Sequence, residues 1–237
     1  KKNLCLAGGV ALNCVSNGKL LREGPFDNLW IQPAAGDAGG ALGVALLIWY
    51  EYLGKDRIAE EAKVMQKASY LGNHYEDKEI EEFLVKEGAP FVKLKTEEIP
   101  SRIAELIADE NVIGWFEGRM EFGPRSLGSR SIIGDPRSKE MQSIMNVKIK
   151  YRESFRPFAP SVLREHVSDY FDINCESPYM LLVANLKDEK KIKMSGEEEK
   201  LFGLEKLKVV RSDVPAITHV DYSARIQTVT RDDNPLY

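Results

Sequence analysis

A segment rich in glycine and arginine offers the clearest chemistry in this chain. Three glycines, three arginines and three serines lie between Gly118 and Ser131, directly after an apolar strand pattern. Arginine presents a planar fork that pairs with two phosphate or carboxylate oxygens. Glycine lets backbone N–H groups approach an anion, and serine hydroxyls add donors. The residue order matches neither a Walker loop nor a dinucleotide-binding fingerprint. We therefore expect an anion site, with a solvated basic turn as the alternative.

A second cationic segment runs from Asn146 to Arg156 and contains four lysines and arginines. If residues 149–152 are extended, Lys150 and Arg152 share one face of the strand, at a separation that suits a polyphosphate. Taken alone, the pattern is more typical of an edge strand protected by charge. Together with the first segment, it predicts a shared anion pocket.

Two single residues are weaker candidates. His219 lies at the expected end of a strand and beside a turn, which makes it a candidate ligand contact, although a lone histidine is more often structural. Asp37 follows a glycine at the expected start of a helix, where most aspartates are simple caps.

Composition excludes several classes of protein. The 237 residues carry 33 lysines and arginines against 37 acidic residues, a net charge of -4, which argues against general coating of nucleic acid. Three widely spaced cysteines without a CxxC pair indicate reduced thiols in the cytoplasm. The longest apolar stretch, residues 41–50, is too short to span a bilayer. The abrupt ends of the sequence predict a piece of a longer protein.

The first block reads as two strand–turn–helix units. We expect strands at residues 3–6 and 28–31 and helices at 10–21 and 38–53. Gly39, Gly40 and Gly43 each cost up to about 1 kcal/mol against alanine in a helix, which suggests close backbone contact there.

A charged segment, residues 60–95, leads into a second block, and we place the domain boundary near Tyr70. The expected helices and strands of this block alternate: helices near 76–82, at 99–109, 139–147 and 162–170, and strands at 112–116, 179–186, 216–220 and 224–229. Alternation of strands and helices predicts an α/β fold throughout.

Several motifs together resemble the NodU/CmcH-type carbamoyltransferases. They are Leu6–Asn13, Pro33–Gly40, Gly118–Ser131 continued by Asp135–Arg137, Asn146–Pro160, and Thr218–Asp221 with Arg225. They cover most of the chain in the family's order. The departures are small: Ser126 and Ser129 stand where alanine and asparagine are usual.

The resemblance implies a two-domain enzyme. Residues 1–70 would be the C-terminal portion of an actin-like (ASKHA) carbamoyl-transfer domain. Residues 71–237 would be a YrdC-like α/β domain with a twisted mixed sheet, incomplete at its C-terminus. Such enzymes are ATP-dependent O-carbamoyltransferases. They make carbamoyl-adenylate from carbamoyl phosphate and ATP, and pass the carbamoyl group to a hydroxyl of a small-molecule or sugar acceptor.

The resemblance also implies roles for individual residues. The expected catalytic set is Arg125, Arg130, Ser131, Lys150, Arg152 and His219, with the cations meeting the charge that grows on the phosphate oxygens. The expected nucleotide contacts are Gly8, Gly9, Asn13, Arg119 and Arg225. Asp37 resembles a metal ligand. The cofactors would be ATP, Mg²⁺ and iron or a similar divalent metal. The usual HxxxH pair is missing from this sequence. We therefore expect weak or absent metal and no transfer by this chain alone, whereas anion or nucleotide binding can survive.

Two alternatives remain open. One is a threonylcarbamoyl-forming enzyme for tRNA, which uses the same two folds but is disfavoured by the loop sequence and the acidic pI. The other is a non-catalytic module that binds nucleotide or carbamoyl phosphate. The intact cations at 125, 130, 150 and 152 argue against such a degenerate domain.

Overall fold

The computed structural model describes residues 1–58 and 65–237, so residues 59–64 of the predicted charged segment lie outside the described residues. Two parallel strands, β1 (Asn3–Leu6) and β2 (Asn28–Ile31), pair with Asn3 opposite Asn28, and both predicted strands are confirmed. Helix α1 (Cys14–Glu23) connects them. It begins later than predicted because a 3-10 turn, Gly9–Leu12, precedes it and the Asn13 side chain caps it by accepting from Ser16 N–H at 3.1 Å.

Helix α2 (Asp37–Leu47) follows β2 and continues as a π-helical turn, Ile48–Tyr52. Gly36 is its N-cap and Asp37 its first residue, one position from the prediction. The predicted close contact exists at Gly39, where a Cβ would meet the Ala34 carbonyl oxygen, whereas Gly40 and Gly43 face open space.

The rest of the chain forms two further groups of strands with short helices. The helices are α3 (Asp77–Lys86), α4 (Ile99–Ala108), α5 (Met141–Ile144), α6 (Val167–Tyr170) and α7 (Leu204–Leu207). The strands are β3 (Ile113–Phe116), β4 (Arg130–Ile133), β5 (Ser161–Leu163), β6 (Phe171–Asp172), β7 (Leu182–Leu186) and β8 (Ser223–Val229). Single turns of 3-10 helix lie at Lys67–Ser69, Thr96–Glu98, Arg164–His166, Asp188–Lys190, Glu198–Lys200 and Pro215–Ile217, and a π-helical turn at Met145–Ile149.

Strand β8 organises the larger sheet, whose order is β5-β8-β7-β6. It pairs in parallel with β5 and antiparallel with β7, while β3 and β4 form a separate antiparallel pair. The chain is therefore α/β with a mixed sheet, as predicted. The boundary near Tyr70 and the actin-like and YrdC-like assignments stay predictions.

The main core lies against this sheet. Phe171, Leu186 and Ile226 are almost fully buried and belong to one apolar cluster, which Val162 and Phe158 cover from the side. Burial of such side chains contributes roughly 1.5–3 kcal/mol each. A smaller cluster of Met141, Met145 and Ala216 packs against Ile132 of β4, which joins the two groups of strands.

Two of the predicted helices and strands differ from the structure. Residues 161–163 are strand β5 instead of the start of a helix, because Pro160 breaks any helix there and β8 offers a parallel edge with Val162 opposite Thr228. Residues 216–220 are not a strand, since Pro215 starts a 3-10 turn that packs Ala216 and Ile217 into the core.

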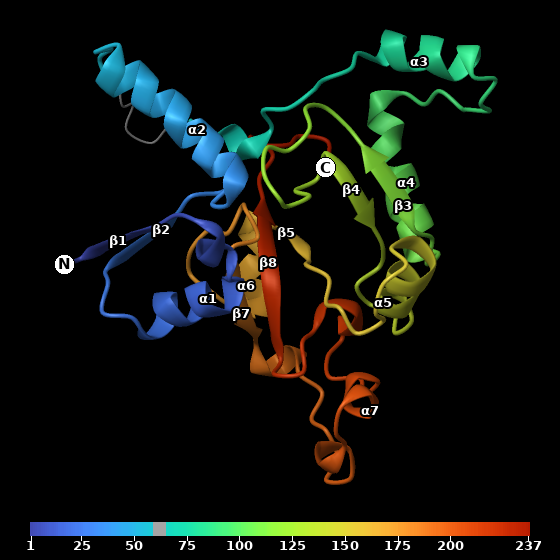
Figure 1. Cartoon of the computed structure of the whole chain (residues 1–237). Helices are drawn as coiled ribbons and strands as arrows, with labels where there is room; N and C mark the ends of the chain where they lie inside the picture. The colour runs from blue at the N-terminus through green and yellow to red at the C-terminus, as the bar shows by residue number, and fades with distance from the viewer. Residues whose placement is uncertain (59–64) are drawn as a thin grey trace.

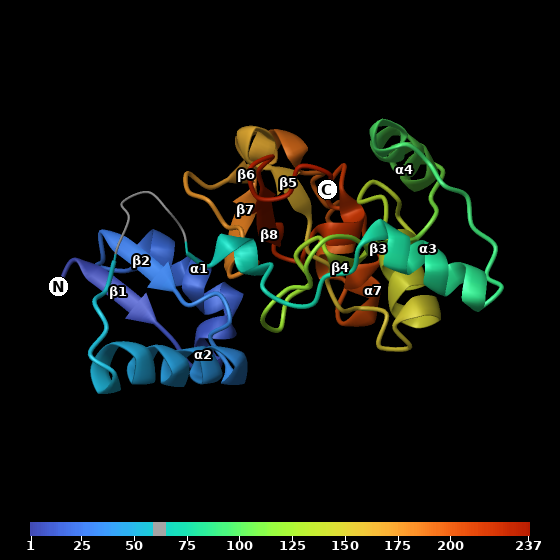
Figure 2. The same cartoon turned by 90° about the horizontal axis from the view of Figure 1, so that it is seen from above.

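The N-terminal unit lies on one side of the larger sheet, and β3, β4, α3 and α4 lie on the other, as both views show (Figures 1 and 2). Helix α1 packs on β7 through polar contacts. Asn17 donates to the carbonyls of Ala11 and Leu181 at 2.8 and 3.0 Å, and Arg22 donates to that of Val183 at 2.9 Å. None of the helices among residues 1–58 and 65–237 is long and apolar enough to cross a membrane.

Gly18 allows the close approach of α1 to β7, so we expect Gly18→Ala to lower the free energy of unfolding by about 1–3 kcal/mol. Its new Cβ would meet the Val183 backbone oxygen, which cannot rotate away. Gly40→Ala is the matched control in α2, where nothing lies within 4 Å, and should raise stability by up to about 1 kcal/mol. Urea denaturation measures both, and equal effects would contradict the packing assigned to Gly18.

Candidate functional site

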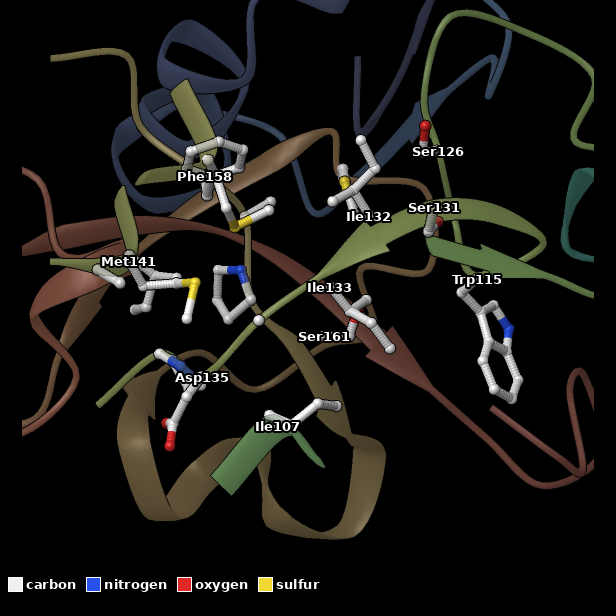
Figure 3. Close-up of a pocket in the computed structure, with 18 of the residues that line it drawn as sticks. Ile107, Trp115, Ser126, Ser131, Ile132, Ile133, Asp135, Met141, Phe158 and Ser161 are labelled. Atoms are coloured by element: carbon white, nitrogen blue, oxygen red, sulfur yellow. The ribbon is translucent and has the colours of Figure 1, made fainter. Parts of the chain in front are cut away.

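A cavity of about 800 Å³ lies among α4, the β3–β4 pair, α5 and the 157–160 link. Figure 3 shows Trp115 at one end and Met141 and Phe158 at the other, with Ile132 and Ile133 between them. Five cations belong to its wall: Arg125, Lys150, Arg152, Arg156 and Arg225. The cavity therefore combines an apolar wall with a high positive charge, and its volume is in the range of small-ligand sites.

Lys150 and Arg152 reach the cavity from a turn, so the extended conformation considered for residues 149–152 is wrong. Lys150 N–H donates to the Met145 carbonyl at 2.9 Å and Tyr151 has a φ of +46°, which reverses the chain. The buried Asn146 side chain holds the turn: it donates to the Arg156 carbonyl at 2.8 Å and accepts from Arg152 Nε at 2.6 Å.

Arg125 comes from the glycine- and arginine-rich segment and touches the N-terminal unit. Its Nη2 donates to the Leu12 carbonyl at 3.2 Å, while its buried Nε has no hydrogen-bond partner among the described residues. A buried donor without a partner costs about 1–3 kcal/mol. The Nε–H of Arg125 is thus a donor that no described residue uses.

Arg225 lies on β8 and is partly buried. Burial, followed by the neighbouring charges of Arg125 and Arg152, lowers the pKa of its guanidinium. Its Nε is also buried without a partner among residues 1–58 and 65–237. The guanidinium stays protonated at neutral pH, so this arrangement is unfavourable until an anion enters.

The same repulsion acts on the rest of the cavity. Burial and the charge of Arg152 lower the pKa of Lys150, and burial and Arg156 lower the pKa of Arg152. Within the described part of the chain, no carboxylate forms an ion pair with Arg125, Lys150, Arg152 or Arg225, although Glu153 pairs with Arg156 at 2.8 Å. The geometry therefore fits an anion with several oxygens.

Glu121 shapes the loop that carries Arg125. Its Oε1 accepts from the backbone N–H groups of Leu127, Ser129 and Arg130 at 2.7, 2.9 and 3.1 Å. Gly123 has a φ of +123° and lies so close to Ala34 that a Cβ would approach the Ala34 Cβ to 2.9 Å. The loop thus packs against the segment between β2 and α2.

Arg130 lies in the same loop but does not reach the cavity. Its guanidinium donates to the carbonyls of Glu117, Ser129, Gly118 and Asn73 at 2.8–3.3 Å and stacks 3.6 Å from the centre of the Phe116 ring. These contacts use its donors to hold the loop together. Ser131 does line the cavity, and its hydroxyl accepts from Gly128 N–H at 3.1 Å.

Arg119 lies outside the cavity, where it donates to the Gly72 carbonyl at 3.1 Å in a shallow surface pocket with His74 and Tyr75. Gly8, Gly9 and Asn13 are exposed on the N-terminal unit and do not line the cavity either. The structure thus separates the predicted nucleotide contacts of the first block from the cationic cavity.

His219 differs from the expectation that it is one of the cations. Burial is the main cause that lowers the pKa of its imidazole, and the charges of Arg225 and Arg211 lower it further against the opposing effect of Asp221. His219 is therefore neutral at pH 7, and it is not among the residues that line the cavity.

Asp37 stands exposed in the first turn of α2. No three His, Cys, Asp or Glu side chains come together as a metal site would require in the described ranges 1–58 and 65–237. The described residues alone therefore do not supply a set of iron ligands, and the role of Asp37 as a metal ligand stays a prediction.

Two residues of the cavity wall were not among the predicted site residues. One is Arg156, which stands in the second cationic segment, so its charge alone could have marked it as a predicted site residue. Trp115 lies in an apolar strand pattern, where only the tertiary structure shows that its Nε1 donates to Gly128 at 2.9 Å beside the cavity.

The fold and the cavity define an α/β protein with a cavity lined by cations. Comparison with known families identifies two matches. A family model described as "Carbamoyltransferase C-terminus" matches residues 104–237, and one described as "Carbamoyltransferase N-terminus" matches residues 1–46. The chain belongs to the carbamoyltransferase family.

Three relatives illustrate the family. The chain is 58% identical over 238 residues to uncharacterized protein sll1178 of Synechocystis sp., 42% identical over 239 residues to nodulation protein NolNO of Sinorhizobium fredii, and 40% identical over 238 residues to nodulation protein NolO of Bradyrhizobium diazoefficiens. These matches cover 99–100% of this chain but only 38%, 32% and 39% of the relatives. The chain thus spans about a third to two fifths of the curated relatives it matches.

Proposed function

We propose that the cationic cavity binds carbamoyl phosphate and ATP and forms carbamoyl-adenylate as part of an O-carbamoyltransferase. The observation that carries the proposal is the convergence of Arg125, Lys150, Arg152 and Arg225 on one cavity without a carboxylate partner in the described part of the chain. Membership of the carbamoyltransferase family supports it.

The cations suit the charge changes of this reaction. Carbamoyl phosphate gives up phosphate to water, and the resulting carbamate oxygen bonds to the α-phosphorus of ATP as the bond to pyrophosphate breaks. Negative charge shifts onto the leaving oxygens, and donors already in place stabilise it without reorganisation. Lys150, Arg152 and Arg225 would hold phosphate oxygens, and Arg125 would use its free Nε–H.

The apolar wall suits the rest of the nucleotide. Trp115 and Tyr237 lie with ring centres 6.2 Å apart on the wall of the cavity, where an adenine ring would pack. Mg²⁺ would arrive with ATP, held by phosphate oxygens, which are the ligands it prefers.

The wider assignment follows from the same proposal. Residues 1–70 would be part of an actin-like domain that passes the carbamoyl group to a hydroxyl of a small molecule or sugar, and residues 71–237 would be YrdC-like. We place this chemistry in the cytoplasm. A tRNA acceptor is disfavoured by the net charge of -4.

The test is exchange of labelled pyrophosphate into ATP that depends on carbamoyl phosphate, with calorimetric binding of each ligand to the same preparation. We expect Lys150→Met to lower exchange about 100-fold, as does the loss of one donor to a developing charge. Lys148→Met is the matched control, because Lys148 is an exposed lysine of the same segment outside the cavity wall.

The outcomes separate the two candidate functions. Exchange that is lost in Lys150→Met and kept in Lys148→Met supports adenylation. Binding of both ligands without exchange would favour a non-catalytic binding module, which the unpaired cations also permit. Absence of binding would overturn both.

A further inference from the structure

Three side chains at the start of β8 form a continuous chain of hydrogen bonds. Ser223 Oγ lies 2.6 Å from Asp221 Oδ1, and His219 Nδ1 lies 3.0 Å from the same Ser223 Oγ. Ser223 N–H also donates to Asp221 Oδ1 at 3.1 Å. The backbone fixes the geometry further, since His219 N–H donates to the Ser223 carbonyl at 2.8 Å.

The direction of this chain follows from what each group can donate. An ionised carboxylate only accepts, so the one hydroxyl proton of Ser223 is committed to Asp221. The Ser223 oxygen must then accept from His219, which places the imidazole proton on Nδ1. Nε2 is left as an acceptor, and it is buried without a partner among the described residues.

The charge of Arg225 acts on this imidazole, since it contributes to lowering the pKa of His219. Residues 223 and 225 are two positions apart on one strand, so their side chains emerge from the same face of β8. The Nε of Arg225 is a buried donor without a partner, and the Nε2 of His219 is a buried acceptor without one. One is a donor and the other an acceptor, no hydrogen bond joins them in this structure, and Arg225 belongs to the cavity wall.

We propose that Asp221 and Ser223 are positioning residues that hold His219 as a neutral imidazole protonated on Nδ1, so that its Nε2 can accept a hydrogen bond from Arg225 and orient that guanidinium when an anion binds. The electrostatic surroundings of His219 are consistent with a neutral imidazole. Arg225 and Arg211 oppose a second proton on the ring, Asp221 favours one, and burial outweighs Asp221, so the pKa falls. The orientation of Arg225 toward an anion rests on the proposed function, whereas the tautomer of His219 does not.

Nitrogen NMR of histidine-labelled protein reads the tautomer directly. The chain has three histidines, so His74→Gln and His166→Gln assign the remaining signals to His219. We expect a single neutral form with the proton on Nδ1 at pH 7, which persists below the ordinary pKa of about 6.5. A proton on Nε2, or an imidazolium at pH 7, would overturn the proposal.

Variants of the two positioning residues should no longer hold the His219 imidazole in a single tautomer. In Ser223→Ala and Asp221→Ala we expect a mixture of both neutral forms, because each variant removes one acceptor of the hydrogen-bond chain. Ser138→Ala and Asp213→Ala are the matched controls: Ser138 is buried with a hydroxyl that has no partner in the described ranges, and Asp213 forms an ion pair with Lys190 at 3.5 Å. An unchanged single tautomer in Asp221→Ala, which alters an exposed side chain, would contradict the assigned role.

Inorganic phosphate is the probe for the effect on the cavity. Loss of a neutral hydrogen bond corresponds to about a threefold to tenfold change in affinity, so we expect His219→Leu to bind phosphate that much more weakly. His219→Gln supplies an amide oxygen as acceptor and should recover most of the affinity. Equal phosphate affinities of His219→Leu and the unaltered chain would contradict the proposed hydrogen bond between His219 and Arg225. If the unaltered chain binds no phosphate at all, the proposed function fails while the NMR result still decides the tautomer.

Discussion

Replacing Arg225 by methionine is expected to weaken phosphate binding about 10- to 100-fold while leaving the free energy of unfolding unchanged or about 1 kcal/mol higher. The guanidinium is buried beside Arg125 and Arg152, and its Nε has no partner in the described residues. Methionine fills a similar volume without charge, so it removes both the repulsion and the unpaired donor. The anion loses one of its cations, so binding and stability should move in opposite directions.

Calorimetry with phosphate and urea denaturation measure the two effects on the same preparation. Arg164→Met is the control, because Arg164 is an exposed arginine that pairs with Glu176 at 2.7 Å and lies outside the cavity wall. It should change neither quantity by more than about 0.5 kcal/mol. A large loss of stability in Arg225→Met with unaltered phosphate binding would mean that Arg225 is a structural residue.

Glu121→Ala should lower the free energy of unfolding by about 3 kcal/mol or more, the largest effect on stability that we predict. One carboxylate oxygen satisfies three backbone N–H groups, and Glu121 is only 9% exposed, so water cannot easily replace it. The loop that carries Arg125 would lose its shape, and phosphate binding should weaken as well.

Glu121→Gln separates the acceptor from the charge. Its amide oxygen can still accept from the loop, so the expected loss is nearer 1 kcal/mol. Glu105→Ala serves as the control, since Glu105 forms an exposed ion pair with Arg102 on α4 and its removal should cost under about 0.5 kcal/mol. Thermal and urea denaturation rank the stabilities of the three variants. If Glu121→Ala is as stable as Glu105→Ala, the Glu121 carboxylate does not hold the loop together.

Local patterns predicted much of the chain, because short strands and long helices follow from the spacing of apolar residues. Strands β1 and β2 and helix α4 agree with the predicted positions within a residue. Strand β5 does not, since three residues after Pro160 pair with β8, which lies some 60 residues further along the sequence. A strand at a sheet edge depends on a partner that no local window contains.

The sequence by itself determined the charges of the site and the family, because the arginine- and lysine-rich motifs are contiguous. Only the tertiary structure decided which cations act together. Arg125 and Arg130 stand five positions apart with the same side chain, yet Arg125 reaches the cavity and Arg130 turns to the carbonyls of residues 73, 117, 118 and 129. The same holds for His219, whose neutral state depends on burial and on Arg211 and Arg225. A guanidinium or an imidazole takes its role from the backbone oxygens and charges that folding brings within a few ångströms, and for Arg125 one of these is the carbonyl of Leu12, 113 positions away in the sequence.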